Sequence, residues 1–117
     1  MRIDGRVQAV IESGEEADEI LRASLAAVHD GAGTPWSAIA FAEQGRMVIG
    51  PVAGTAPDDA PAAALAVPIV YRGDTVAALW LGGAPDAAIV AELERAAALL
   101  APYCLVGWDT RGEEWVP

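Results

Sequence analysis

The first third of the chain repeats its apolar side chains at intervals of three and four residues, the period of an amphipathic α-helix. One stripe falls within residues 3–11 and a second within residues 14–29. Ser13, followed three residues later by Glu16, has the pattern of a capping box, and the glycine just beyond His29 is typical of a helix end. We therefore expect two helices, with Ser13 as the N-cap of the second. The stripes contain Ile3, Val7, Val10, Ile11, Ile20, Leu21, Leu25 and Val28.

After Thr34-Pro35 the apolar period changes to two, which predicts β-strands that pair as two hairpins. Pro68, inside the third strand, indicates an edge position, a bulge or a free donor site, because proline cannot donate to a strand ladder. Gly50-Pro51 should end the first hairpin, and residues 51–63, with three prolines, are predicted to form an irregular loop. The four predicted strands are residues 36–42, 46–49, 65–71 and 75–81.

A last helix is predicted over residues 85–101, and Pro102 should terminate it. The tail that follows contains two of the four tryptophans and could extend as a strand through Leu105 and Val106. The order of helices and hairpins predicts an α+β domain, in which a central antiparallel sheet of four to six strands has helices packed on one face.

The length of 117 residues favours a single domain. We divide it into an N-terminal helix (1–13), a core (14–102) and a tail (103–117). The formal net charge of −10 argues against nucleic-acid binding and against adsorption to anionic membranes. A single cysteine and the absence of a signal-like apolar segment favour a cytoplasmic location.

Few side chains in the sequence could carry out chemistry. Cys104 is the only cysteine and lies among apolar neighbours, so we expect a buried structural thiol and no thiolate metal site. His29 is the only histidine, and its place at a predicted helix end suits a charge that complements the helix dipole. We therefore expect no catalytic residues, no metal and no cofactor.

Strand alternation brings an apolar set of residues together on one side of the predicted sheet. If the first and fourth strands share a sheet, two tryptophans flank a floor of alanines, a shallow apolar site for a small ligand. The members of this set are Trp36, Ala38, Ala40, Ala78 and Trp80. Ordinary packing under the loop or the tail would explain the same pattern.

Two further groups of apolar residues need a partner surface. Trp108 and Trp115 lie in a polar tail, so they must either fold back over the open sheet face or dock on another subunit. Ile3, Val7 and Val10, beside the second helix, predict a homodimer packed through helices.

The order of elements and several short segments resemble the GAF domain, a small-molecule-sensing relative of the PAS fold. The likeness spans residues 15–101, and the final helix lies where the family's closing helix lies. The segments that carry it are Trp-Ser-Ala-Ile-Ala-Phe at 36–41, Val-Ile-Gly-Pro-Val-Ala-Gly at 48–54, Val-Pro-Ile-Val-Tyr-Arg-Gly-Asp at 67–74 and Ala-Ala-Leu-Trp-Leu at 77–81.

Within that family, the sequence motifs most resemble those of the free methionine-sulfoxide reductases, but this chain differs from that branch in one segment. In the family a long segment between the hairpins roofs the ligand pocket and carries the reductase cysteines, whereas residues 51–63 are short and contain no cysteine. The reductase reaction needs a nucleophilic and a resolving thiol, so Cys104 alone cannot reproduce it. The resemblance therefore implies a GAF domain with a reduced pocket.

These observations favour a non-catalytic binding or interaction module, a signalling or regulatory homodimer with a small or vestigial apolar ligand site. One alternative is a thiol-dependent redox enzyme that uses Cys104. Another is an interaction scaffold similar to the roadblock/longin family, which also places an antiparallel sheet between helices. A helix within residues 51–63 would favour that scaffold, and the prolines there argue against it.

Overall fold

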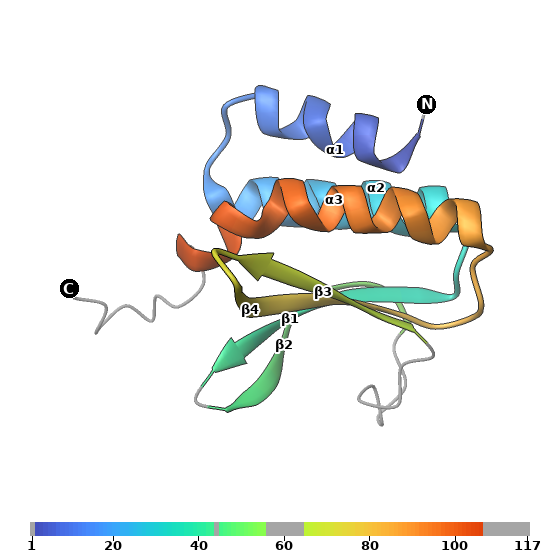
Figure 1. The fold of residues 1–117 in the computed structure, drawn as a ribbon. Coiled ribbons are helices and arrows are strands. Elements are labelled where there is room, and N and C mark those ends of the chain that lie inside the picture. Colours follow the sequence, from blue (N-terminus) through green and yellow to red (C-terminus); the bar gives the residue numbers. More distant parts are fainter. Residues whose placement is uncertain (1, 44, 56–64, 107–117) are drawn as a thin grey trace.

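The protein is a layer of helices packed on one face of an antiparallel β-sheet (Figure 1). A computed structural model describes residues 2–43, 45–55 and 65–106. The predicted α+β class, with helices on one face of a central antiparallel sheet, is confirmed.

The sheet has four strands in the order β2-β1-β4-β3, and all neighbouring strands are antiparallel. The two hairpins pair through β1 and β4, which occupy the centre. Pro68 lies on the edge strand β3, which is one of the three positions that the sequence left open for it, and proline is tolerated on edge strands. The strands are β1 (Trp36–Glu43), β2 (Arg46–Gly54), β3 (Leu65–Tyr71) and β4 (Asp74–Leu81).

The helices are α1 (Ile3–Glu12), α2 (Ala17–Ala32) and α3 (Ala87–Val106). α2 and α3 lie against the sheet, and α1 lies on their outer side (Figure 1). Within the part of the chain that the structure describes, no helix combines the length and apolar character needed to cross a membrane.

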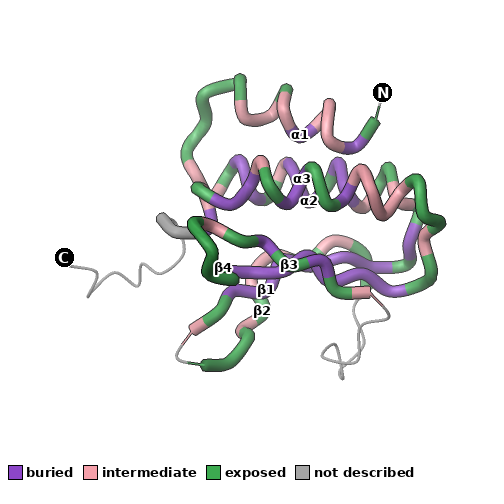
Figure 2. Tube along the Cα trace, viewed as in Figure 1, coloured by how far each residue is buried: buried purple, intermediate pink, exposed green. Residues whose placement is uncertain are grey.

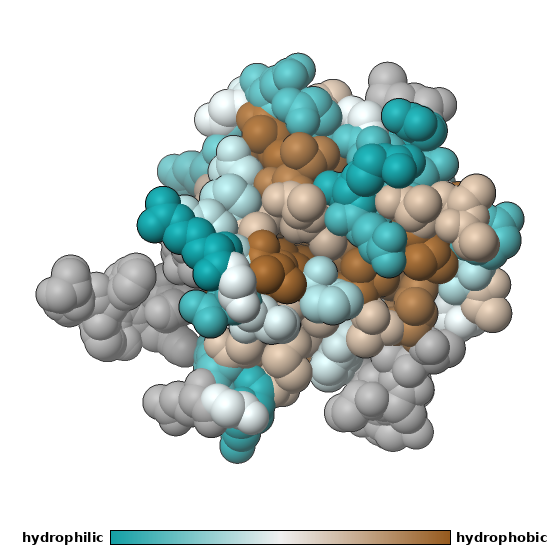
Figure 3. Space-filling view, viewed as in Figure 1, coloured by the Kyte–Doolittle hydropathy of each residue, from teal (hydrophilic) through white to brown (hydrophobic). Residues whose placement is uncertain are grey.

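One continuous core fills the space between the helices and the sheet. Figure 2 shows the buried positions along the inner sides of α2 and α3 and through the middle of the strands. Seen from the side of α3, hydrophobic and hydrophilic residues are interspersed on the surface, with hydrophobic residues at the level of the helix and the sheet (Figure 3). The largest fully buried side chains are Ile3, Leu21, Leu25, Ile39, Ile69, Leu79, Leu81, Leu93 and Leu100.

The predicted capping box at the start of the second helix is wrong. Ser13 ends α1, and its hydroxyl donates a hydrogen bond of 2.5 Å to the Val10 carbonyl. α2 begins at Ala17, after an N-cap at Glu16 that makes no side-chain capping bond, and it ends at Ala32 with Gly33, not Gly31, as its C-cap. Ser13 is thus the C-cap of α1, so the serine that the sequence assigned to the start of the second helix ends the first.

Two predicted ends are also wrong. β2 continues through Gly50-Pro51 to Gly54, because a bulge opposite Ala38–Ala40 places the proline where β1 requires no hydrogen bond. α3 continues through Pro102 to Val106, so Leu105 and Val106 are helical and not a strand. Pro102 is exposed, so water can solvate the carbonyl that it leaves unpaired in the preceding turn.

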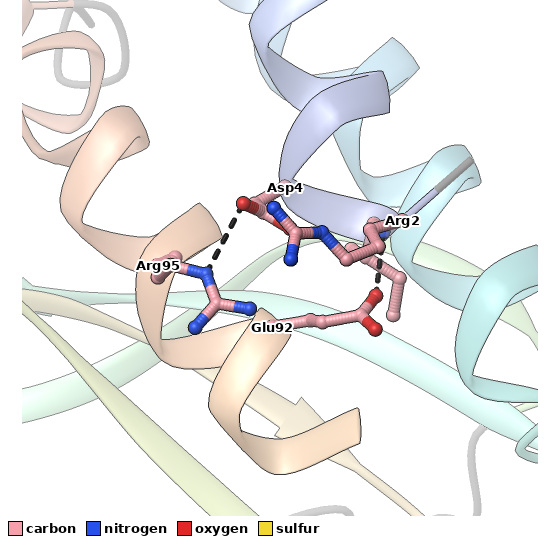
Figure 4. A network of polar contacts seen from close by, with 5 residues as sticks. Arg2, Asp4, Glu92 and Arg95 are labelled. Carbon is pink, nitrogen blue, oxygen red and sulfur yellow. Dashed lines mark hydrogen bonds and ion pairs between the residues drawn. The ribbon is translucent and has the colours of Figure 1, made fainter. Parts of the chain in front are cut away.

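α1 is attached to α3 by a small polar network at its first turn (Figure 4). The backbone N–H of Ile3 donates to Glu92 Oε1 at 2.7 Å, and Arg95 Nε donates to Asp4 Oδ2 at 3.2 Å. Arg2 Nε lies 3.6 Å from the other Asp4 oxygen. Burial opposes ionisation of Asp4, but the hydrogen bond from Arg95 and the charges of Arg2 and Arg95 outweigh it and lower the pKa of this carboxyl.

Replacement of Asp4 by Asn should loosen α1 from α3. The lowered pKa means that the folded state holds this proton less tightly, so the stabilisation is present above the ordinary value of 3.8 and is lost as the pH falls below it. We expect faster hydrogen exchange in α1 and a lower Tm at neutral pH. Asp18→Asn is the control, because Asp18 pairs with Arg22 on an exposed surface and should contribute little. Equal effects of the two substitutions would contradict the proposed role of Asp4.

Candidate functional site

The face of the sheet that points away from the helices carries a second, separate apolar cluster. Strand register explains its composition: Ala38 lies opposite Trp80, and Ala40 lies opposite Ala78, across the central β1–β4 pair. The cluster is Trp36, Ala38, Ala40, Ala78 and Trp80, each no more than 9% exposed. The structure thus brings together all five residues that strand alternation predicted for one side of the sheet.

The two tryptophans do not flank the alanines from opposite ends. Since Ala38 pairs with Trp80, Trp36 and Trp80 are diagonal neighbours on adjacent strands, a separation that large aromatic side chains span. Ala40 and Ala78 continue from them toward the hairpin turns. The cluster is therefore a floor of alanines with both indoles at one end.

Gly82 makes room for the Trp36 indole at that end. Its N–H donates to the Trp36 carbonyl at 3.1 Å, and a Cβ added at this glycine would collide with the indole nitrogen. Any larger residue at position 82 would therefore push the ring from its place.

Exposed aliphatic side chains form two margins beside this floor. On β2, Val52 is opposite Ala38, Ile49 is opposite Ala40, and Met47 is opposite Ala42. These three are 45%, 37% and 36% exposed, and Val70 on β3 is 46% exposed. We call the five central residues and these four marginal ones the Trp36–Trp80 face.

The sequence prediction missed all four marginal residues. Their alternation marked them as strand residues, but only the register with β1 and β4 places them beside the alanines. Val52 was not even predicted to lie in a strand, because the predicted second strand ended at residue 49.

The residues predicted for an interface or a pocket cover differ in how far the structure buries them. Ile3 and Val7 are buried in the core of this chain, at 2% and 0% exposure, whereas Val10 is half-buried. Trp108 and Trp115 lie outside the described residues.

Val10 lines an open groove of about 850 Å³ between α1 and α2. The groove has an alanine floor, and four carboxylates line one end. It lies among the helices, on the opposite side of the sheet from the Trp36–Trp80 face, and the carboxylates make that end a poor place for an apolar ligand. The carboxylates are those of Glu15, Glu16, Asp18 and Glu19.

Cys104 lies on α3 within the main core and is 7% exposed. Burial raises the pKa of its thiol from 9.0 to about 12, so the thiol is protonated at physiological pH. It lies in the core between the helices and the sheet, on the opposite side of the sheet from the Trp36–Trp80 face.

His29 lies in the last turn of α2, where the sequence placed it. Its Nδ1 is 3.4 Å from the hydroxyl of Ser37, which is fully buried, and the same hydroxyl is 3.4 Å from Thr34 Oγ1. These contacts join the end of α2 to the start of β1. Because no part of Ser37 reaches solvent, the pair fits a structural contact rather than a nucleophile and its base.

No family model matches this sequence, and no curated protein matches it either. The structure is similar to that of the GAF domain from Acinetobacter phosphoenolpyruvate-protein phosphotransferase, with a TM-score of 0.68 and 13% sequence identity. The similarity covers 88% of this chain and 90% of that one. The chain therefore has the fold of a GAF domain, as the short motifs around its strands predicted.

Proposed function

We propose that this chain is a non-catalytic regulatory module that binds a small, neutral, apolar ligand on the Trp36–Trp80 face. The observation that carries the proposal is that this face is apolar across all four strands, although the described helices pack on the other face. An antiparallel sheet usually turns polar side chains toward water on its uncovered face. A contiguous apolar surface of this kind is typical of a binding site.

The chemistry of the face supports an apolar ligand rather than a charged one. The paired positions on its central strands carry alanine and tryptophan, and those on β2 carry methionine, isoleucine and valine. The small alanine side chains would leave room for a group once whatever buries them is displaced, and the neighbouring indoles would contact an aromatic or aliphatic group. No carboxylate or guanidinium is part of the Trp36–Trp80 face, so a charged ligand would lose its hydration without compensation.

The redox alternative has less support. A thiol reacts as thiolate, and burial of Cys104 keeps it protonated in the core behind the sheet. A buried free thiol also suits a reducing compartment, which supports our proposal of a cytoplasmic location. The segment that would have favoured a roadblock/longin scaffold is a strand up to Gly54, and residues 56–64 lie outside the described part.

We further propose that the module forms a homodimer in which α1 packs antiparallel against α1 of a second copy. Arg2 and Arg6 lie at the start of α1 with Asp4 between them, and Glu12, Glu15 and Glu16 lie at or just after its end. Within one chain Arg2 already pairs with Asp4 and Arg6 with Asp30. An antiparallel arrangement would bring Arg2 and Arg6 of each helix beside the acidic end of the other, where they would add intermolecular partners to their intrachain ones, and the contact would be self-complementary. Ala9 and Val10 would supply the apolar centre of the interface.

The ligand proposal predicts a response in a screen of neutral aromatic and aliphatic metabolites by thermal shift and tryptophan fluorescence. A true ligand at a hundredfold excess over its Kd should stabilise the fold by about 2.7 kcal/mol. Ile49→Glu places a charge at the margin and should weaken binding about tenfold or more. Ala98→Glu, at an exposed position of α3, is the matched control and should leave binding unchanged. A broad screen without a single ligand would refute the proposal.

The dimer proposal predicts a dimer in sedimentation velocity at micromolar concentration. Val10→Asp should convert it to a monomer, since it places two like charges together at the centre of the interface. Val70→Asp, on the far side of the sheet, should leave the dimer intact. A wild-type chain that sediments only as a monomer would contradict the proposal.

The burial of Cys104 predicts a pH dependence of stability. Its pKa is about 12 in the folded chain and 9.0 when unperturbed, so above pH 9.0 the unfolded state loses the proton first. Stability should then fall with rising pH, by up to about 1.4 kcal/mol per pH unit. Cys104→Ala should lack this part of the slope in urea titrations. A thiol that reacts with a chromogenic disulfide reagent as fast in the native chain as in the unfolded chain would disprove its burial.

A further inference from the structure

The Trp36–Trp80 face lacks a described element that covers it, although its centre is buried. All three helices pack on the opposite side of the sheet (Figure 1). Yet Ala38 and Ala40 have no exposed area, and the marginal residues are exposed by a third or more. A surface of this composition favours an apolar cover in water.

The path of α3 brings the end of the described chain to one end of this face. α3 starts beyond Leu81, at the end of β4, and its 20 residues return over roughly 30 Å to Val106. In Figure 1 the red end of α3 lies beside the β3–β4 turn, on the same side of the molecule as the β1–β2 turn. Residues 107–117 therefore begin at the end of the sheet that carries both hairpin turns.

Their length and composition fit the face. Eleven residues reach roughly 36 Å when extended, which is long enough to pass from the end of α3 around the hairpin-turn end of the sheet and bring the last residues onto the face. The segment carries Trp108, Trp115 and Val116, which are apolar groups without a described partner surface. Its formal charge is −2, from three acidic residues and one arginine.

Two arginines at the hairpin turns supply the opposite charge. Arg46 starts β2 and Arg72 lies in the β3–β4 turn, and both are exposed. Neither forms an ion pair within the described residues, whereas Arg2, Arg6, Arg22 and Arg95 all pair with carboxylates of the helices. A chain that rounds this end of the sheet with Glu113 and Glu114 would pass both guanidinium groups, of which that of Arg72 lies over the Tyr71 ring at 5.1 Å.

We propose that residues 107–117 of the same chain occupy the Trp36–Trp80 face, so that they act as a built-in competitor of its ligand. This inference rests on the proposed function for the identity of the site but not for the contact itself. The contact would make the apparent affinity of the ligand depend on how easily the segment is displaced. Any partner or modification that holds the segment on the face would lower the apparent affinity for the ligand, and any that releases the segment would raise it.

Disulfide trapping in the full chain tests the contact without any ligand. In a Cys104→Ala background, Ile49→Cys places a thiol at the margin of the face and Val116→Cys places one beside Trp115. Oxidised glutathione should join them into an intramolecular disulfide, with two thiol protons and two electrons passing to glutathione. The matched control pairs Val116→Cys with Ala98→Cys, on α3, from which the segment starts. We expect the first pair to close about tenfold faster than the control.

Charge variants add an independent arm. Arg46→Glu together with Arg72→Glu should slow closure of the first pair, and Glu113→Arg with Glu114→Arg should restore it. Arg22→Glu, on the exposed side of α2, is the control and should have no effect. Equal closure rates for the two cysteine pairs, or a disulfide that links two copies, would overturn the proposal.

The two proposals fail in different ways. With the probe being a neutral aromatic compound from the screen, Trp108→Ala with Trp115→Ala should tighten its binding about fivefold or more, because the competitor is weakened. Unchanged affinity together with equal closure rates refutes the segment as occupant and leaves the ligand site intact. Fast, selective closure without any ligand in the screen supports the segment and refutes the ligand proposal.

Discussion

The structure depends on a mismatch between a sheet that is apolar on both faces and helices that cover only one of them. β1 and β4 form the centre of the sheet, and both strands carry mostly apolar side chains on each of their two faces. On the helix side, burial of Ile39, Phe41 and Leu79 supplies the hydrophobic stabilisation of the main core. The other side is also apolar, and exposing it to water would cost more free energy than exposing a polar face.

The two faces differ in the size of their side chains as well as in their cover. Bulky aliphatic residues fill the helix side, where close packing excludes space for a ligand. On the other side, alanines at positions 38, 40 and 78 lower the floor, and the indoles stand at one end of it. This difference explains why the Trp36–Trp80 face is suited to accept a group from outside, whether a ligand or a segment of the chain.

The reactive side chains lie away from that face. Cys104 is protonated within the core of the helix side, and His29 ties α2 to β1 through a buried serine. The GAF-like fold thus places the thiol of Cys104 and the imidazole of His29 in structural contacts, apart from the Trp36–Trp80 face. This separation is the physical reason why we propose a binding role for the Trp36–Trp80 face and none for Cys104 or His29.

Much of the architecture follows from the sequence because it depends on local periodicity. The change from a period near 3.6 to a period of two separates helices from strands, Pro68 marks an edge, and alternation gathers the five residues of the floor. The sequence could not locate Ser13 at the end of α1, carry β2 past Pro51 or carry α3 past Pro102. Those outcomes depend on contacts with neighbouring elements and on exposure to water, which override local signals.

The tertiary structure alone decided which residues surround the floor and which lie beneath the helices. The register of β2 on β1 brings Ile49 and Val52 to the margin, and the diagonal of β1 and β4 puts both tryptophans at the same end. It also buries Ile3 and Val7 in the core, where the sequence had predicted an interface or cover. A pattern along one chain segment shows that a residue seeks an apolar environment, but only the pairing of distant segments determines which surface provides it.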